Sequence, residues 1–248
     1  MFYQIKQYED FYNSREGRVV RHTLKKTLDP LFDGTKGRVI GLGYASPYIG
    51  KNLSLFSAEL YEDGARVNGY KGRDINNISF AHLHRIPLET SSVDVIVMVH
   101  GLEYSFVPDE VLKDIFRVLK SEGKFILVVP NRAGLWTNVS WAPFGHGHPF
   151  SSTQLKSLLE KSNFKCERIC SALYFPPFRK PFIYNMANIL EKYGQSLLSA
   201  FGGVNVAVAR KKTYATIKPS KGTAVPVRTS KAIKPTVARA ESSRLKSK

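Results

Sequence analysis

Two glycines stand where a short apolar run near residue 40 ends, in the segment RVIGLGYASPYIG of residues 38–50. The run predicts a β-strand over residues 38–42, so that Gly41 and Gly43 lie in a tight turn that opens a helix. Pro47 suits the first turn of that helix, because the N–H that proline lacks would be unpaired there. Glycine lets a ligand approach the backbone, and the turn therefore predicts a small-molecule site at the end of this strand.

A nicotinamide dinucleotide is one candidate ligand for such a turn. Its site needs a third Gly or Ala where Ser46 stands, and an acid that closes the second strand. We predict the second strand at residues 65–68, and Glu62 and Asp63 precede it rather than follow it. The sequence therefore disfavours a dinucleotide site.

Short apolar runs alternate with helical patterns as far as residue 210, which is typical of an α/β protein with a parallel sheet. The further strands are predicted at residues 93–99, 124–129, 164–173 and 204–209, and the helices at residues 17–31, 109–119, 153–161 and 183–200. The helix at 109–119 has the clearest pattern, because apolar residues recur there every three to four positions.

Residues 85–131 carry a series of positions in a fixed order. These are Ile86 and Pro87, Asp94 at the start of a strand, the turn Leu102, Glu103 and Tyr104, and a helix end at Arg117, Val118, Leu119 and Lys120 before Gly123. With the glycine turn, this order resembles the class I S-adenosylmethionine-dependent methyltransferases over residues 38–210. The resemblance implies a Rossmann-like, doubly wound, mostly parallel seven-stranded sheet with an antiparallel last strand and helices on both faces.

The same resemblance implies S-adenosylmethionine as the cofactor and an unidentified methyl acceptor. The residues that it places at the cofactor are Tyr12, Gly41, Gly43, Tyr44, Pro47, His82, Leu83, His100 and Leu102. It also places His100 and Glu103 beside the methyl-transfer centre, as catalytic candidates; the alternative for this pair is a structural turn. A Gly43→Val substitution is expected to abolish cofactor binding at modest cost in stability, provided that the backbone angles of Gly43 are ordinary.

The chain departs from the family pattern at three positions. Gly41 stands where the first motif has an acid, no acid closes the predicted second strand, and His82 replaces the Asp on the adenine side. These departures leave open an alternative function. It is a non-catalytic methyltransferase-like domain that binds RNA or a protein partner through a basic tail and an aromatic loop.

The aromatic loop, residues 130–155, follows the fifth strand and holds both tryptophans. Ligand sites in open α/β sheets lie beyond the carboxyl ends of the strands, so this loop is placed to meet the acceptor. The predicted acceptor-binding residues are Asn131, Arg132, Trp136, His146 and His148, and His146 is also a candidate for proton transfer. The other interpretation of the two histidines is hydrogen bonding that shapes a loop rich in Gly and Pro. Two interpretations also apply to the aromatic residues near the N-terminus, which form either a lid over the cofactor or the packing face of a helix. These residues are Tyr8, Phe11 and Tyr12.

Positive charge is concentrated at the end of the chain. From Lys211 onward eleven Lys or Arg face the single acid Glu241, so the first 210 residues carry +7 of the net charge of +17. We predict a methyltransferase-like domain over residues 1–212, with an N-terminal helical flank at 1–36, and a disordered basic tail at 213–248. Nucleic acid is the candidate partner of the tail, because phosphates attract clustered Lys and Arg.

Several classes of protein are not indicated. No stretch approaches the ~20 apolar residues of a membrane-spanning helix, and the N-terminus lacks a signal-peptide core, so we expect a soluble, cytoplasmic protein without a membrane partner. Cys166 and Cys170 have no second pair, and the histidines have no acid or Cys at ligand spacing. We therefore expect reduced thiols and no metal site.

Overall fold

The computed structural model describes most of the first 212 residues. The described ranges are residues 5–35, 37–49, 57–59, 78–80, 82–177, 179, 186–198 and 200–212. Met1–Thr213 form one compact unit, and the remaining residues, Tyr214–Lys248, form a separate one. The disorder predicted for residues 213–248 concerns a segment outside the described residues. No helix in the described part of the chain is long and apolar enough to cross a membrane.

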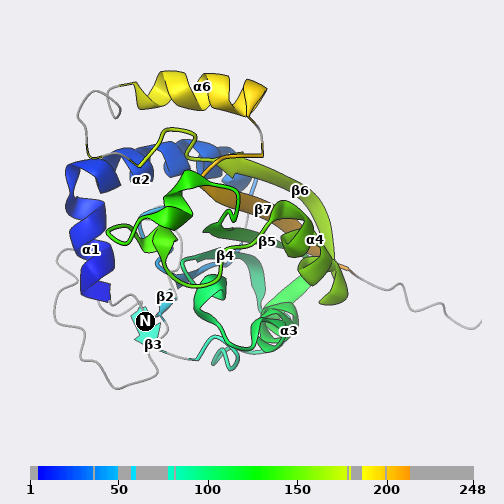
Figure 1. The fold of residues 1–248 in the computed structure, drawn as a ribbon. Helices are drawn as coiled ribbons and strands as arrows, with labels where there is room; N and C mark the ends of the chain where they lie inside the picture. The colour runs from blue at the N-terminus through cyan, green and yellow to red at the C-terminus, as the bar shows by residue number, and fades with distance from the viewer. Residues whose placement is uncertain are drawn as a thin grey trace, which may run out of the picture. The chain divides into compact units, whose positions relative to one another are not determined.

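Strands form one sheet in the order β3-β2-β1-β4-β5-β7-β6 (Figure 1). They are β1 (Val39–Gly43), β2 (Ser57–Glu59), β3 (Ile78–Phe80), β4 (Val93–Val99), β5 (Leu119–Pro130), β6 (Phe164–Ala172) and β7 (Val204–Lys211). The first five run parallel to one another, and β7 is antiparallel to both β5 and β6. The predicted α/β class is confirmed.

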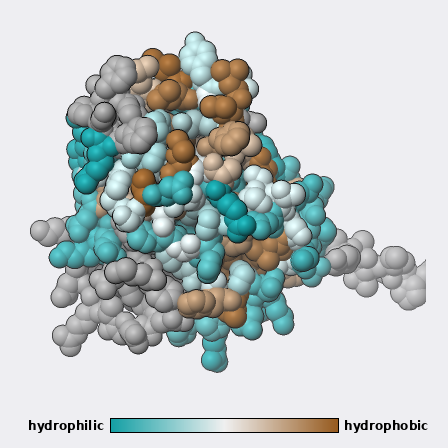
Figure 2. All heavy atoms as spheres, in the orientation of Figure 1, coloured by the Kyte–Doolittle hydropathy of each residue, from teal (hydrophilic) through white to brown (hydrophobic). Residues whose placement is uncertain are grey.

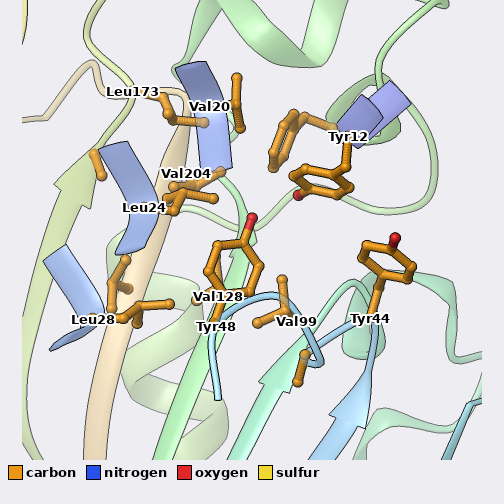
Figure 3. Close-up of a cluster of buried hydrophobic side chains, with 14 of the residues drawn as sticks. Tyr12, Val20, Leu24, Leu28, Tyr44, Tyr48, Val99, Val128, Leu173 and Val204 are labelled. Carbon is orange, nitrogen blue, oxygen red and sulfur yellow. The ribbon is translucent and has the colours of Figure 1, made fainter. Parts of the chain in front are cut away.

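Two hydrophobic clusters fill the two faces of the sheet. Alternate residues of a strand point to opposite faces, so Val95 and Val97 of β4 belong to one cluster and Ile96 and Met98 to the other. Helices α1 (Ile5–Asn13), α2 (Arg15–Leu28) and α6 (Ala187–Leu197) contribute to the first cluster. Helices α3 (Pro108–Val118) and α4 (Ser152–Lys161) contribute to the second. The core under α2 is drawn in Figure 3.

Local signals placed the helices of the second face within one or two residues. Pro108 occupies the first turn of α3, where its missing N–H is not needed. Ser151 caps α4 in a capping box with Gln154, in which each side chain binds the other residue's backbone N–H. Helix α6 is described over Ala187–Leu197, inside the predicted range 183–200, and the predicted residues 183–185 lie outside the described part of the chain.

One prediction near the glycine turn was wrong, and a second lies outside the described residues. Residues 44–49 form turns rather than the first part of a helix opening at Pro47. The second strand is Ser57–Glu59, in parallel register with β1 through Leu42 and Ala58, whereas the predicted strand at 65–68 lies outside the described residues. Three residues are too few for an alternating pattern to be recognised in the sequence. An acid, Glu59, therefore does close the second strand.

Glu191 on the inner side of α6 is a buried carboxyl group with an incomplete set of partners. Its Oε1 accepts a hydrogen bond of 2.5 Å from the backbone N–H of Tyr174, while Oε2 has no hydrogen-bond partner among the described residues. Burial raises the pKa of this carboxyl group from 4.5 to about 7. At pH values between these two pKa values, the native state therefore holds the proton of Glu191 more tightly than the unfolded chain does.

We expect the contribution of Glu191 to stability to be fully present below pH 4.5 and to be lost, by up to about 3 kcal/mol, as the pH rises through 7, because the unfolded chain releases this proton first. Glu191→Gln should remove that component of the pH dependence in urea unfolding at pH 5 and pH 8. Glu89→Gln, at an exposed position, is the control and should leave it in place. Equal pH dependence in both variants would show that Glu191 titrates normally.

Candidate functional site

Strands β1 and β4 approach closely at their carboxyl ends. Gly43 has a φ of +65°, and the next residue, Tyr44, donates its backbone N–H to Val99 O at 2.7 Å. A Cβ at Gly43 would lie 2.3 Å from Val99 O and 2.8 Å from His100 O. The backbone angle is therefore not ordinary, and the expectation that Gly43→Val costs only modest stability is wrong. Gly43 is needed by the fold itself.

His100 directly follows β4 and is enclosed by protein. Its φ is +54°, and its side chain is 1% exposed. Nδ1 lies 3.2 Å from Glu103 Oε1, and Nε2 lies 2.7 Å from the hydroxyl of Tyr12. The second oxygen of Glu103 accepts the backbone N–H of Gly101 at 3.0 Å, which fixes the carboxylate. With a neutral imidazole, Nδ1–H donates to Glu103 and Nε2 accepts from Tyr12.

Helix α1 brings two tyrosines over the ends of β1 and β4. The rings of Tyr8 and Tyr12 both stack on Tyr44, with centroids 5.1 and 5.2 Å apart. Tyr8 also lies 5.0 Å from the imidazole of His100. Figure 3 shows Tyr12 and Tyr44 facing the same space between α1 and the strand ends. Burial raises the pKa of Tyr8 and Tyr12 above the usual value of 10, so both hydroxyls keep their protons.

The aromatic loop covers the same centre from the other side. Phe144 lies 4.9 Å from the ring of His100, and the backbone N–H of His148 donates to Glu103 O at 2.7 Å. Trp136 is fully buried, and its Nε1–H donates to Phe175 O at 2.8 Å. Asn131 is 2% exposed and donates from Nδ2 to Ala200 O and Gly202 O. In this arrangement Trp136 and Asn131 hold the loop in place.

The remaining acceptor candidates lie at the surface of the loop. His146 is half-buried, and its Nε2 lies 2.8 Å from Ser140 O, a contact that shapes the loop as the simpler interpretation predicts. The imidazole of His148 is exposed. Arg132 is exposed as well and donates to Pro149 O at 3.3 Å.

The structure does not bring all predicted cofactor residues together. His82 is exposed and stacks on His84 at 5.2 Å, while Leu83 and Leu102 are buried in the second hydrophobic cluster. Pro47 is half-buried in the turn after β1. Sequence reasoning singled out neither Glu59, whose backbone closes β2, nor Phe144, whose ring lies beside His100. Glu59 is recognised only from the position of β2, and Phe144 only from the folded loop.

The described part of the chain thus forms an α/β domain with a buried polar centre at the carboxyl ends of its parallel strands. Solved structures share this fold. One, from Thermotoga maritima, bears the description "SAM-dependent methyltransferase, possible histamine N-methyltransferase"; it is 17% identical with a TM-score of 0.56, over 84% of this chain and 96% of that one. A methyltransferase structure from Archaeoglobus fulgidus is 18% identical with a TM-score of 0.54, over 82% and 97% of the two chains.

The family follows from a second comparison. The model of the methyltransferase domain family matches residues 12–169, and the chain belongs to that family. A relative from Mycolicibacterium smegmatis, described as a "probable S-adenosylmethionine-dependent methyltransferase", is 30% identical over 93 residues. That match spans 37% of this chain and about a third, 36%, of the relative. Membership of this family does not favour the alternative of a non-catalytic domain. It also argues against a dinucleotide site, even though an acid, Glu59, closes the second strand after all.

Proposed function

We propose that this protein transfers a methyl group from S-adenosylmethionine to an acceptor that carries a removable proton. The observation that carries the proposal is the Tyr12–His100–Glu103 chain of hydrogen bonds at the carboxyl end of β4. A carboxylate that orients an imidazole is the arrangement of a general base. We also propose that the fold is the complete seven-stranded sheet of this class, with an antiparallel last strand. The observed strand order supports this.

The residues present at the strand ends fit the cofactor. Glu59 closes β2 one residue beyond Ala58, which pairs with Leu42, and a carboxylate in that place suits the hydroxyls of a ribose. The stacked rings of Tyr8, Tyr12 and Tyr44 suit a sulfonium cation, because aromatic faces attract positive charge. Bound S-adenosylmethionine supplies an electrophilic methyl group.

His100 is the residue that takes the acceptor's proton. Glu103 holds Nδ1, so Nε2 is the ring atom that faces the acceptor, either directly or through the hydroxyl of Tyr12. Because Tyr12 and His100 are both buried, α1 must move outward for ligands to enter. Once it closes, α1 excludes water and aligns the acceptor, which can supply much of the rate enhancement of an in-line displacement.

Calorimetry with purified full-length protein tests the cofactor. We expect saturable binding of S-adenosylmethionine with a Kd below roughly 1 mM. Glu59→Gln should weaken binding roughly tenfold or more, because hydrogen bonds to a charged group are the strong ones. Glu89→Gln, an exposed acid away from the strand ends, is the matched control. No binding heat with the wild-type protein would refute the proposed function.

A further inference from the structure

Helix α6 and the residues after it expose a run of large apolar side chains. Ile189 is 51% exposed, Tyr193 59%, Leu197 76%, Leu198 53% and Phe201 59%. We call these five residues the α6 ridge. They make up most of the exposed large hydrophobic residues in the described part of the chain, yet they lie within 13 positions of one another. Figure 2 shows this hydrophobic surface at the top of the molecule, where Figure 1 places α6.

The α6 ridge faces outward because the opposite side of the helix is fixed. Ala187 is 3% exposed, and a Cβ at Gly194 would lie 2.3 Å from Tyr174 Cβ, so the helix packs tightly there. Glu191 is on the same inner side and binds the backbone of Tyr174. Ile189, Tyr193 and Leu197 are spaced by four residues and therefore share the other side. Rotating the helix to hide them would expose Ala187 and Gly194 and break the Glu191 bond.

Cations outnumber acids around the α6 ridge. The single acid of α6 is Glu191, which is buried, whereas Lys192 is exposed. Lys26 of the neighbouring helix α2 donates to Asn188 of α6 at 3.1 Å. Helix α2 carries further exposed cations at Arg15 and Arg18, while its acid Glu16 is half-buried and Asp29 at its end pairs with Lys25. The whole chain has a net charge of +17.

We propose that the α6 ridge binds the surface of an anionic membrane, with the helix lying in the interface. An outward apolar helix face bordered by Lys and Arg is the pattern of interfacial helices, whose apolar side enters the boundary of the acyl chains. The basic border and the net charge add attraction to anionic lipids. Nucleic acid would satisfy the cations but not the five apolar side chains. Peripheral binding of this kind needs no spanning helix.

Vesicle flotation with the full-length protein tests this proposal. We expect binding to vesicles of phosphatidylcholine with phosphatidylglycerol, and weaker binding to phosphatidylcholine alone. The double variant Leu197→Ser, Leu198→Ser should lower the partition coefficient roughly tenfold or more, because two apolar contacts with the acyl boundary are lost. Its matched control is Val107→Ser, Leu135→Ser, at positions 42% and 55% exposed and outside α6. The control should bind like the wild type.

Three outcomes would overturn the proposal. The first is that the wild type does not float with either kind of vesicle. The second is that both double variants bind as tightly as the wild type, which would assign the contact to charge elsewhere on the chain. The third is that the wild type does not bind vesicles and sediments as a dimer, whereas the Leu197→Ser, Leu198→Ser variant sediments as a monomer. A second copy of the chain would then be the partner of the α6 ridge. Circular dichroism of each variant verifies that the fold is intact.

Discussion

Replacing Gly43 with alanine is expected to lower the free energy of unfolding by about 3 kcal/mol or more, combining left-handed backbone strain with overpacking. The added Cβ would lie 2.3 Å from Val99 O and 2.8 Å from His100 O. Both oxygens belong to the backbone, which cannot move away as a flexible side chain could. Gly34→Ala is the matched control. Gly34 has a similar φ of +69°, but a Cβ there meets nothing within 4 Å. The control should therefore cost only the backbone strain, about 1 kcal/mol.

Urea unfolding of the two variants beside the wild type separates strain from crowding. The difference between Gly43→Ala and Gly34→Ala measures how tightly β1 and β4 approach at their ends. Equal losses in the two variants would mean that the strands can separate there, and that the backbone bond from Tyr44 to Val99 O contributes little. Because Gly43→Ala destabilises the fold itself, it is not a suitable probe of cofactor binding.

The sequence predicted the second face of the sheet well because its signals are local. The apolar spacing of α3, the Ser151 cap of α4 and the unbroken apolar run of β4 each lie within a dozen residues. Such patterns depend on helix and strand periodicity, which is independent of the rest of the fold. The prediction for His100 and Glu103 at the exit of β4 has a different basis, because it came from the resemblance to the methyltransferase family and not from periodicity.

The partners of His100 follow from long-range packing. Tyr12 and His100 are 88 residues apart, and nothing in either segment indicates that their side chains share a hydrogen bond. The fold must first place α1 over the carboxyl ends of β1 and β4. Trp136 illustrates the opposite case, since an aromatic residue in a loop near the site is fully buried and bonds to Phe175 O. Composition marks such a loop as unusual but does not separate its contacts with ligand from its contacts with protein.

His100→Asn is expected to lower the rate of methyl transfer by roughly 10²–10⁴-fold while leaving the Kd for S-adenosylmethionine within about threefold of the wild type. Asparagine tolerates the positive φ of +54° at this position, so the backbone of the β4 exit should survive the change. Loss of the imidazole removes the proton acceptor that Glu103 orients. The measurement is release of S-adenosylhomocysteine with a deproteinised cell extract as the source of acceptor, beside calorimetry of the cofactor.

His148→Asn is the matched control, because its imidazole is exposed and only its backbone contacts Glu103. This variant should keep the wild-type rate. The rate of Glu103→Gln should fall between the rates of these two variants. The amide oxygen can still accept one hydrogen bond, but the charge that favours a protonated imidazole is gone. An unchanged rate in His100→Asn, with cofactor binding retained, would make the Tyr12–His100–Glu103 chain a structural support of the β4 turn. The proton of the acceptor would then leave to water.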